Sequence, residues 1–251
     1  MTAVNTALNG NPFGAPGSIN DPSKQTQALK TDENGWRKST DNIVANNLST
    51  DEEHFLLLQV IEDYLARRYV EADADSVMCI RNLLSHWIQT LLAIDSEVVD
   101  RDIQRSKTVF DRNTKIKDFM RDLCIPQIVQ SWWTILERCS DTTAQCLCLD
   151  AVAAFVDWID VELVANDVFV PLVIARLGNK DTSEAAVRAV SALIQKGMPP
   201  SKKLSLVTAL TDVMRSNHLI SVNPNSDYED VLRAGSLLSA VGSVLIDTYH
   251  K

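Results

Sequence analysis

From residue 51 onward, apolar residues recur at the three- and four-residue spacing of amphipathic helices. About eight such segments follow one another with short loops between them, and most fall into pairs that repeat at roughly 40 residues. No segment alternates apolar and polar residues as a half-buried strand does. Each helix pair in such an array buries its apolar face only by stacking on the next pair. The pattern therefore predicts an all-α fold, a HEAT-repeat-like α-solenoid of antiparallel helix pairs.

Turn residues are concentrated at the N-terminus. The 251-residue chain contains eight Gly and eight Pro, and four of these Gly and three of these Pro lie within residues 1–35. The rest of the sequence is poor in the residues that the turns of a β-sandwich or barrel require, which supports the all-α prediction. Residues 1–23 are rich in Gly, Pro and Asn, and we expect them to form a disordered tail.

Two of the predicted helices have well-defined apolar stripes. Thr50, followed by Glu53, fits a capping box at the start of the first helix. Its expected buried stripe consists of Phe55, Leu58, Ile61, Leu65 and Tyr69. The second helix is predicted over residues 109–123, and its expected buried stripe consists of Val109, Ile116, Phe119, Met120 and Leu123. Pro126 then fits the first turn of a further helix.

Basic residues gather in one segment of an acidic chain. The net charge is −9, yet residues 101–121 contain seven Lys or Arg against three Asp. Two interpretations of this basic run remain open. It could follow an RNA backbone by charge pairing with phosphates, or it could be a solvated helix face partly neutralised by Asp102, Asp111 and Asp118. The candidate RNA-binding residues are Arg101, Arg105, Lys107, Arg112, Lys115, Lys117 and Arg121.

No pattern in the sequence indicates catalysis, a metal site or a membrane segment. The four histidines are scattered, and HExxH, GxSxG and Walker A motifs are absent. The five cysteines include no CxxC pair and fit reduced thiols of a cytosolic or nuclear protein. No signal peptide is apparent, and no apolar run approaches the roughly 20 residues of a membrane span. We therefore expect no catalytic residues, no cofactor, no metal and no membrane insertion.

Aromatic and acidic residues follow the basic run. Trp132 and Trp133 could stack nucleic-acid bases, but core packing of at least one of them is the favoured interpretation. Asp157, Asp160 and Glu162 form a small cluster near a predicted helix end. Carboxylates in such a position usually cap helices or pair with arginine rather than act as acids or bases.

Several sequence blocks resemble the tRNA exportins of the importin-β (karyopherin) superfamily. Within residues 91–136, the matching blocks are AIDSEVVDRD, RNTKIKDFMR and CIPQIVQSW. A further block, VDWIDVELVANDVF at 156–169, and the KGM turn at 196–198 also resemble this family. The resemblance covers most of residues 24–251. It implies that residues 24–90 are importin-β-like N-terminal repeats and that residues 91–251 are an exportin-1-like HEAT-repeat region.

The resemblance implies a nuclear export receptor that binds tRNA cooperatively with the GTP form of Ran. Such a receptor passes nucleoporins in the pore and shuttles between nucleus and cytoplasm. The Ran-binding helices would lie near Trp36–Asn47 and Ser76–Ile88. The family has about one further helical repeat between Gln89 and Ala93, and a long C-terminal arch, so the chain is expected to be a fragment. Two alternatives remain: another karyopherin with protein cargo, or a helical-repeat scaffold without RNA binding.

Overall fold

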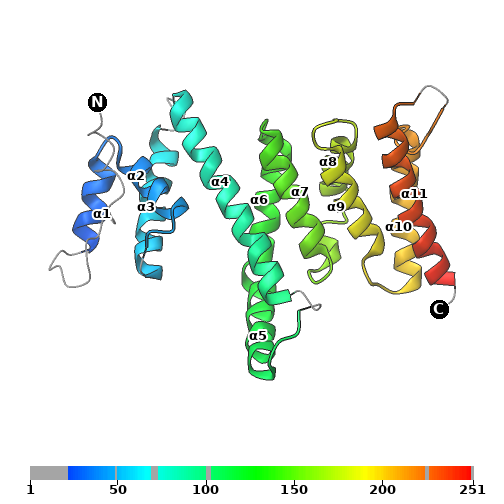
Figure 1. Ribbon diagram of the computed structural model, residues 1–251, viewed down its shortest axis with the longest axis horizontal. Helices are drawn as coiled ribbons and strands as arrows, with labels where there is room; N and C mark the ends of the chain where they lie inside the picture. The colour runs from blue at the N-terminus through cyan, green and yellow to red at the C-terminus, as the bar shows by residue number, and fades with distance from the viewer. Residues whose placement is uncertain (1–21, 49, 69–72, 100–102, 224–225, 250–251) are drawn as a thin grey trace. The chain divides into compact units, whose positions relative to one another are not determined.

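The computed structural model describes residues 22–48, 50–68, 73–99, 103–223 and 226–249. Every regular element within these ranges is a helix, and they contain no strand (Figure 1). The chain divides into two compact units, residues 1–87 and 88–251, and each is described by itself. The predicted all-α fold is confirmed.

The first unit contains α1 (Pro22–Thr31), α2 (Gly35–Val44), α3 (Asp51–Arg68) and the first part of α4 (Ala74–Ile94). The helices α1 and α2 both pack on α3. Trp36 of α2 is buried and stacks on Tyr64 of α3 with 4.0 Å between ring centroids. Gly35 permits the approach of α1 to α2, because a Cβ atom there would lie 1.9 Å from the carbonyl oxygen of Leu29.

The buried face of α3 agrees with the predicted stripe at Ile61 but differs from it elsewhere, and the predicted residue Tyr69 lies outside the described residues. Leu57, Val60 and Ile61 are the buried residues, whereas Phe55 is 60% exposed and Leu58 is 48% exposed. The segment is apolar on two adjoining stripes, and the packing of α1 and α2 selects one of them. The predicted helix start is confirmed, since Thr50 Oγ1 accepts a hydrogen bond from the Glu53 N–H at 3.2 Å.

In the second unit, α4 continues into a π-helical segment, η2 (Asp95–Val99). The helices that follow are α5 (Lys107–Leu123), α6 (Ile125–Arg138), α7 (Thr142–Val156), α8 (Phe169–Leu177), α9 (Ser183–Gln195), α10 (Pro200–Ser216) and α11 (Tyr228–Tyr249). A short 3-10 helix, η3 (Val161–Leu163), precedes α8.

From α6 onward the helices form three stacked pairs, α6/α7, α8/α9 and α10/α11 (Figure 1). The second helices stack in sequence, α7 on α9 and α9 on α11, while α6 packs against α8. Small buried residues such as Ala151 on α7 and Ala189 on α9 permit close approach. The predicted stacking of helix pairs, each covering the apolar face of its neighbour, is confirmed for this unit.

Cationic side chains connect successive layers of the stack. Lys196 Nζ donates to the carbonyl oxygens of Asp157 and Ile159, at 2.7 and 2.9 Å, just after α7. Arg176 of α8 donates to the carbonyl of Leu136 in the last turn of α6. The last carbonyls of a helix have no partner inside the helix and carry partial negative charge, so a cation is a favourable partner.

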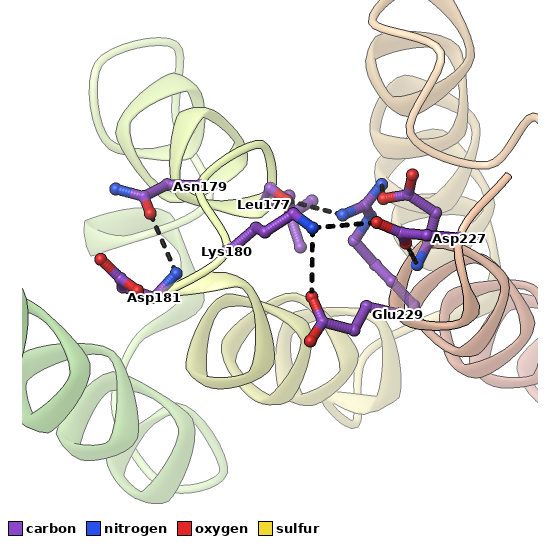
Figure 2. Close-up of polar contacts among 8 residues, drawn as sticks. Leu177, Asn179, Lys180, Asp181, Asp227 and Glu229 are labelled. Carbon is purple, nitrogen blue, oxygen red and sulfur yellow. Dashed lines mark hydrogen bonds and ion pairs between the residues drawn. The ribbon is translucent and has the colours of Figure 1, made fainter.

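The junction before α11 has the same arrangement. Arg233 Nη1 donates to the carbonyl of Leu177 in the last turn of α8, at 3.1 Å. Figure 2 shows Lys180 beside Asp227 and Glu229, with Nζ–O distances of 3.0 and 4.0 Å. Hydrogen bonding to Asp227 raises the pKa of the Lys180 ammonium group, and the hydrogen bond from the Asp230 N–H lowers the pKa of Asp227.

Two helical segments reach the length and mean hydropathy of a membrane span, contrary to the expectation from sequence. They are Asp75–Val99, with 11% of the apolar window buried, and Tyr228–Tyr249, with 28% buried. In the second segment, Ala234, Leu237 and Val244 are buried where α11 packs on α9 and α10. Core helices of stacked folds share this length and composition.

Candidate nucleic-acid interface

Six of the seven predicted RNA-binding residues lie in the described part of the chain, and Arg101 lies outside it. Arg105 precedes α5, and the other five lie on α5 itself. The helix begins at Lys107, because the Ser106 hydroxyl accepts a hydrogen bond from the Val109 N–H at 3.4 Å.

Arg105 and the side chain of Asn113 bind the carbonyl end of η2. Arg105 Nη2 donates to the carbonyl of Ser96 at 2.8 Å, and Asn113 Nδ2 donates to the carbonyl of Glu97 at 2.8 Å. These contacts satisfy carbonyls at the end of the α4–η2 helix. Part of the basic run therefore has a structural function that the sequence did not predict.

The guanidinium group of Arg112 is hydrogen-bonded along one edge and exposed along the other. Its Nε and Nη2 donate to Oδ1 of Asn113 at 3.1 and 3.0 Å, and Nη2 lies 3.7 Å from a carboxylate oxygen of Glu97. The side chain of Arg112 is nevertheless 59% exposed. Arg112 thus combines a fixed orientation with access to solvent.

Arg121 connects α5 to the segment that follows α7. Its Nη1 forms an ion pair with Asp118 at 3.0 Å, and its Nε donates to the carbonyl of Trp158 at 3.3 Å. The indole nitrogen of Trp158 in turn donates to a carboxylate oxygen of Asp95 at 2.9 Å. Arg121 is therefore a structural link as well as a surface charge.

Three lysines of the basic run have no ion pair or hydrogen bond among the residues that the structure describes. Lys107 and Lys115 are exposed, and Lys117 is half-buried. Together with the exposed edge of Arg112, these lysines form the part of the basic run that is available to an external anion. We call these four residues the α5 cation set.

Carboxylates alternate with the lysines of the α5 cation set along one face of the helix. Side chains that are three, four or seven residues apart share a helix face, so Asp111, Asp118 and Asp122 form one line along α5. By the same spacing, Lys107 and Lys115 lie along this line, each four residues from Asp111, while Arg112 and Lys117 lie on opposite sides of it. The arrangement therefore offers separate phosphate contacts and not one continuous basic strip.

The predicted apolar stripe of α5 is only partly buried. Met120 is buried, but Phe119 is 61% exposed, Leu123 is 57% exposed and Ile116 is 37% exposed. The helix turns its Asn113 and Met120 side toward its neighbours instead. The predicted stripe is confirmed at Met120 and wrong at Phe119 and Leu123, and the buried side includes Asn113, a polar residue that the apolar pattern could not indicate.

Trp132 and Trp133 have different surroundings. Trp132 is fully buried and makes an edge-to-face contact with Phe155 at 5.5 Å, which confirms the core interpretation for this residue. Trp133 is half-buried and lines a groove of about 510 Å³ between α6, η3 and α8. The groove is mostly apolar, and its lining residues include Pro126, Val129, Trp133, Leu163, Val168 and Phe169.

The helices predicted to contact Ran lie at α2 and within α4. On α2, Trp36, Thr40 and Ile43 are buried, and Arg37 is bound to Asp73 at 2.9 Å. Of the predicted segment in α4, Ser76 is buried and Met78 is 55% exposed. The assignment of these helices to Ran stays a prediction.

Among the described residues, no group of three or more His, Cys, Asp or Glu is arranged to hold a metal ion. In the acidic cluster near residue 160, Asp160 caps η3, since its Oδ1 accepts a hydrogen bond from the Glu162 N–H at 3.1 Å, and Glu162 forms an ion pair with Lys202 at 3.2 Å. Asn166 caps α8, with its side-chain oxygen accepting from the Val168 and Phe169 N–H groups at 3.0 and 2.9 Å.

A family model described as Exportin 1-like protein matches residues 34–190, which is more than half of the chain. The chain belongs to the exportin 1-like family. Among its relatives, the Danio rerio protein named Exportin-T is 40% identical over 167 residues, and the Homo sapiens Exportin-T is 36% identical over 167 residues. The Arabidopsis thaliana Exportin-T is 31% identical over 175 residues. The resemblance to tRNA exportins is thereby confirmed.

The alignments with the Danio rerio and Homo sapiens relatives cover 66% of this chain, and the alignment with the Arabidopsis thaliana relative covers 67%. Each alignment covers only 17% of the length of the relative. Within the matched part of the chain, the structure adds residues that the sequence did not single out. Asn113 and Asp95 orient the basic segment, although neither belongs to the predicted RNA-binding set. The only available signal was that both lie in the blocks that carry the family resemblance.

Proposed function

We propose that the chain acts in nuclear export, as a receptor that binds tRNA together with the GTP form of Ran and shuttles between nucleus and cytoplasm. The family assignment and the relatives named Exportin-T support the export function. The single structural observation that supports RNA as cargo is the α5 cation set, whose lysines have no partner within the described residues.

The chemistry of the α5 cation set fits an RNA backbone. Lysine and arginine side chains that contact phosphates release condensed counterions, which gives affinity without a base code. A folded RNA is recognised mainly by its shape and its phosphates, so a few well-spaced cations suffice. The function requires reversible binding only, and we therefore propose a transport receptor without catalytic activity or cofactor.

Cooperation with Ran follows from linkage. If Ran·GTP and tRNA both favour the same arrangement of the helical repeats, each ligand raises the affinity for the other by the same factor. We keep the Ran-binding assignment near Trp36–Asn47 and Ser76–Ile88 as part of this proposal. The nucleoporins and the nuclear pore remain proposed partners on the same basis.

Filter binding of labelled tRNA, with and without Ran·GTP, tests the proposal. Lys107→Gln/Lys115→Gln is the test variant, and Lys202→Gln on α10 is the control, because Lys202 is also an exposed lysine. Each lost phosphate contact should reduce the slope of log affinity against log salt by about one. The control should keep the wild-type slope. Equal slopes in all three proteins would contradict RNA contact by α5.

The same assay separates the two alternatives. Binding of Ran·GTP without RNA would favour a karyopherin with protein cargo. Absence of binding to both ligands would favour a scaffold. Cooperative binding of tRNA and Ran·GTP is the result that the proposal expects.

The groove beside Trp133 is the described surface best suited to the proposed nucleoporin contact. It presents apolar side chains from α6 and α8, and Glu162 is the only ionisable residue among the described residues that line it. A partner that offers single aromatic side chains on an uncharged peptide fits this chemistry. Trp133→Ala should weaken binding of a phenylalanine-bearing peptide by about tenfold or more. Phe110→Ala, an exposed aromatic on α5, should not.

A further inference from the structure

Asn113 is a buried polar side chain whose hydrogen bonds all serve the basic segment. It is 2% exposed, yet it lies on a helix whose other side chains are mostly exposed. Its Oδ1 accepts two hydrogen bonds from Arg112, and its Nδ2 donates to the carbonyl of Glu97. A buried amide is unfavourable unless its hydrogen bonds are made, so this side chain has one well-defined orientation.

The contact with Asn113 determines which edge of Arg112 faces outward. A guanidinium group has five N–H donors in a rigid fork. The Nε–H and one N–H of Nη2 are directed at Asn113, and Nη1 of the 59% exposed side chain makes no hydrogen bond or ion pair with the residues that the structure describes. An arginine that is held in this way loses less side-chain entropy when it binds an anion.

Glu97 contributes a second effect. Its carboxylate lies 3.7 Å from Nη2 of Arg112 and is 66% exposed. A phosphate oxygen that approaches Arg112 therefore meets a neighbouring negative charge. This carboxylate is an internal competitor for the same guanidinium group.

We propose that Asn113 is a positioning residue that presents Arg112 to an RNA phosphate, and that Glu97 weakens this contact by competing for the guanidinium group. The inference rests on the proposed function and identifies a phosphodiester oxygen as the group bound at this position. Asn113 acts through Arg112 and does not touch the RNA itself.

Five variants test the proposal by fluorescence anisotropy with labelled tRNA, in the presence of Ran·GTP and at several salt concentrations. They are Arg112→Gln, Asn113→Leu, the double variant of these two, Glu97→Gln, and Glu97→Gln combined with Arg112→Gln. The two single variants at 112 and 113 should each lower affinity about three- to tenfold and reduce the salt slope by about one. The double variant should be no weaker than Arg112→Gln alone.

Glu97→Gln should raise affinity about two- to fivefold, and only when Arg112 is present. Because both residues of this ion pair are largely exposed, the variant keeps the fold. Its gain of affinity is a result that misfolding does not produce. Thr182→Val, which removes a buried hydroxyl hydrogen-bonded to the carbonyl of Arg176, controls for general destabilisation and should leave the salt slope unchanged.

Three results would overturn the proposal: additive effects of Arg112→Gln and Asn113→Leu, a loss of affinity in Asn113→Leu without a change in salt slope, or unchanged affinity in Glu97→Gln. The outcomes also separate the two levels of inference. If Arg112→Gln has no effect while Lys107→Gln/Lys115→Gln weakens binding, the positioning proposal fails and the proposed function stands. If none of these cation variants matters, the proposed function fails.

Discussion

The indole Nε1 of Trp158 donates a hydrogen bond to a carboxylate oxygen of Asp95 at 2.9 Å, across 63 residues of sequence. Trp158 is buried and packs against Phe155, with 4.9 Å between ring centroids. The carbonyl of the same tryptophan accepts a hydrogen bond from Arg121 on α5. One residue therefore connects η2, α5 and the end of α7, and it fixes the segment on which the basic residues lie.

Replacing Asp95 with alanine should destabilise residues 88–251. The change leaves the buried indole N–H without its acceptor, and loss of a hydrogen bond to a charged group typically reduces the free energy of unfolding by about 1.5–3 kcal/mol. Urea unfolding followed by tryptophan fluorescence measures the effect. Asp95→Asn retains an acceptor oxygen and should lose less than about half of that amount. Equal losses in the two variants would show that the hydrogen bond is not the cause.

Replacement by methionine should change the free energy of unfolding by very different amounts at two adjacent lysines of α10. Lys203 is 7% exposed and donates to the carbonyls of Ile194 and Lys196 at the end of α9. Lys203→Met leaves these carbonyls unsatisfied and should reduce the free energy of unfolding by about 2–3 kcal/mol. Lys202 is exposed and pairs only with Glu162 among the described residues. Lys202→Met should therefore change the free energy of unfolding by less than about 1 kcal/mol. Thermal or urea unfolding of both variants decides the question.

Replacement by alanine should lower the stability of the protein at one glycine and raise it at another. A Cβ atom at Gly35 would lie 1.9 Å from the carbonyl oxygen of Leu29, so Gly35→Ala must push α1 away from α2 and destabilise the first unit. Gly242 lies within α11, where a Cβ atom meets nothing within 4 Å. Gly242→Ala should stabilise the protein by about 0.5–1 kcal/mol. Hydrogen exchange of α1 and α11 reports the two effects separately.

Asp227 should contribute to stability at neutral pH and lose this contribution in acid. The hydrogen bond from the Asp230 N–H, together with Lys180, holds the pKa of Asp227 below its ordinary value of 3.8. The contribution is therefore complete above pH 3.8 and is lost as pH falls through the lower pKa of the folded state. The variant Asp227→Asn keeps a side-chain oxygen for the cap but removes the charge. The urea midpoints of wild type and Asp227→Asn should differ at about pH 5 and converge at the acid end of the titration.

Local sequence patterns were sufficient to predict the helices but not all of their buried faces. The capping residue Thr50 and Pro126 in the first turn of α6 mark helix starts through interactions within a few residues. The stripe containing Leu57, by contrast, was missed because α3 has two apolar stripes and the choice depends on α1 and α2. Helix existence is a local property here, and helix orientation is a tertiary one.

The candidate interface was predictable as a segment but not as a set of contact residues. Seven cations in a short stretch identify the place. Their functions depend on distant partners, such as the carbonyl of Trp158 for Arg121 and the carbonyl of Ser96 for Arg105. Residue spacing along α5 gives no information about such partners, so the distinction between structural and available cations required the structure.

The cation-to-carbonyl contacts between layers, at Arg176 and Lys196, join residues that are about one repeat apart, with separations of 40 and 39 positions for the contacts to Leu136 and Asp157. The α8/α9 pair thus donates to carbonyls of the α6/α7 pair, and Arg233 of α11 donates in the same way to the carbonyl of Leu177 at the end of α8. Loss or gain of one complete repeat conserves this matching, since every donor still meets an acceptor of the same kind. Loss of one helix of a pair would leave helix-end carbonyls without a hydrogen-bond donor. The stack is therefore modular, with the complete helix pair as its smallest exchangeable part.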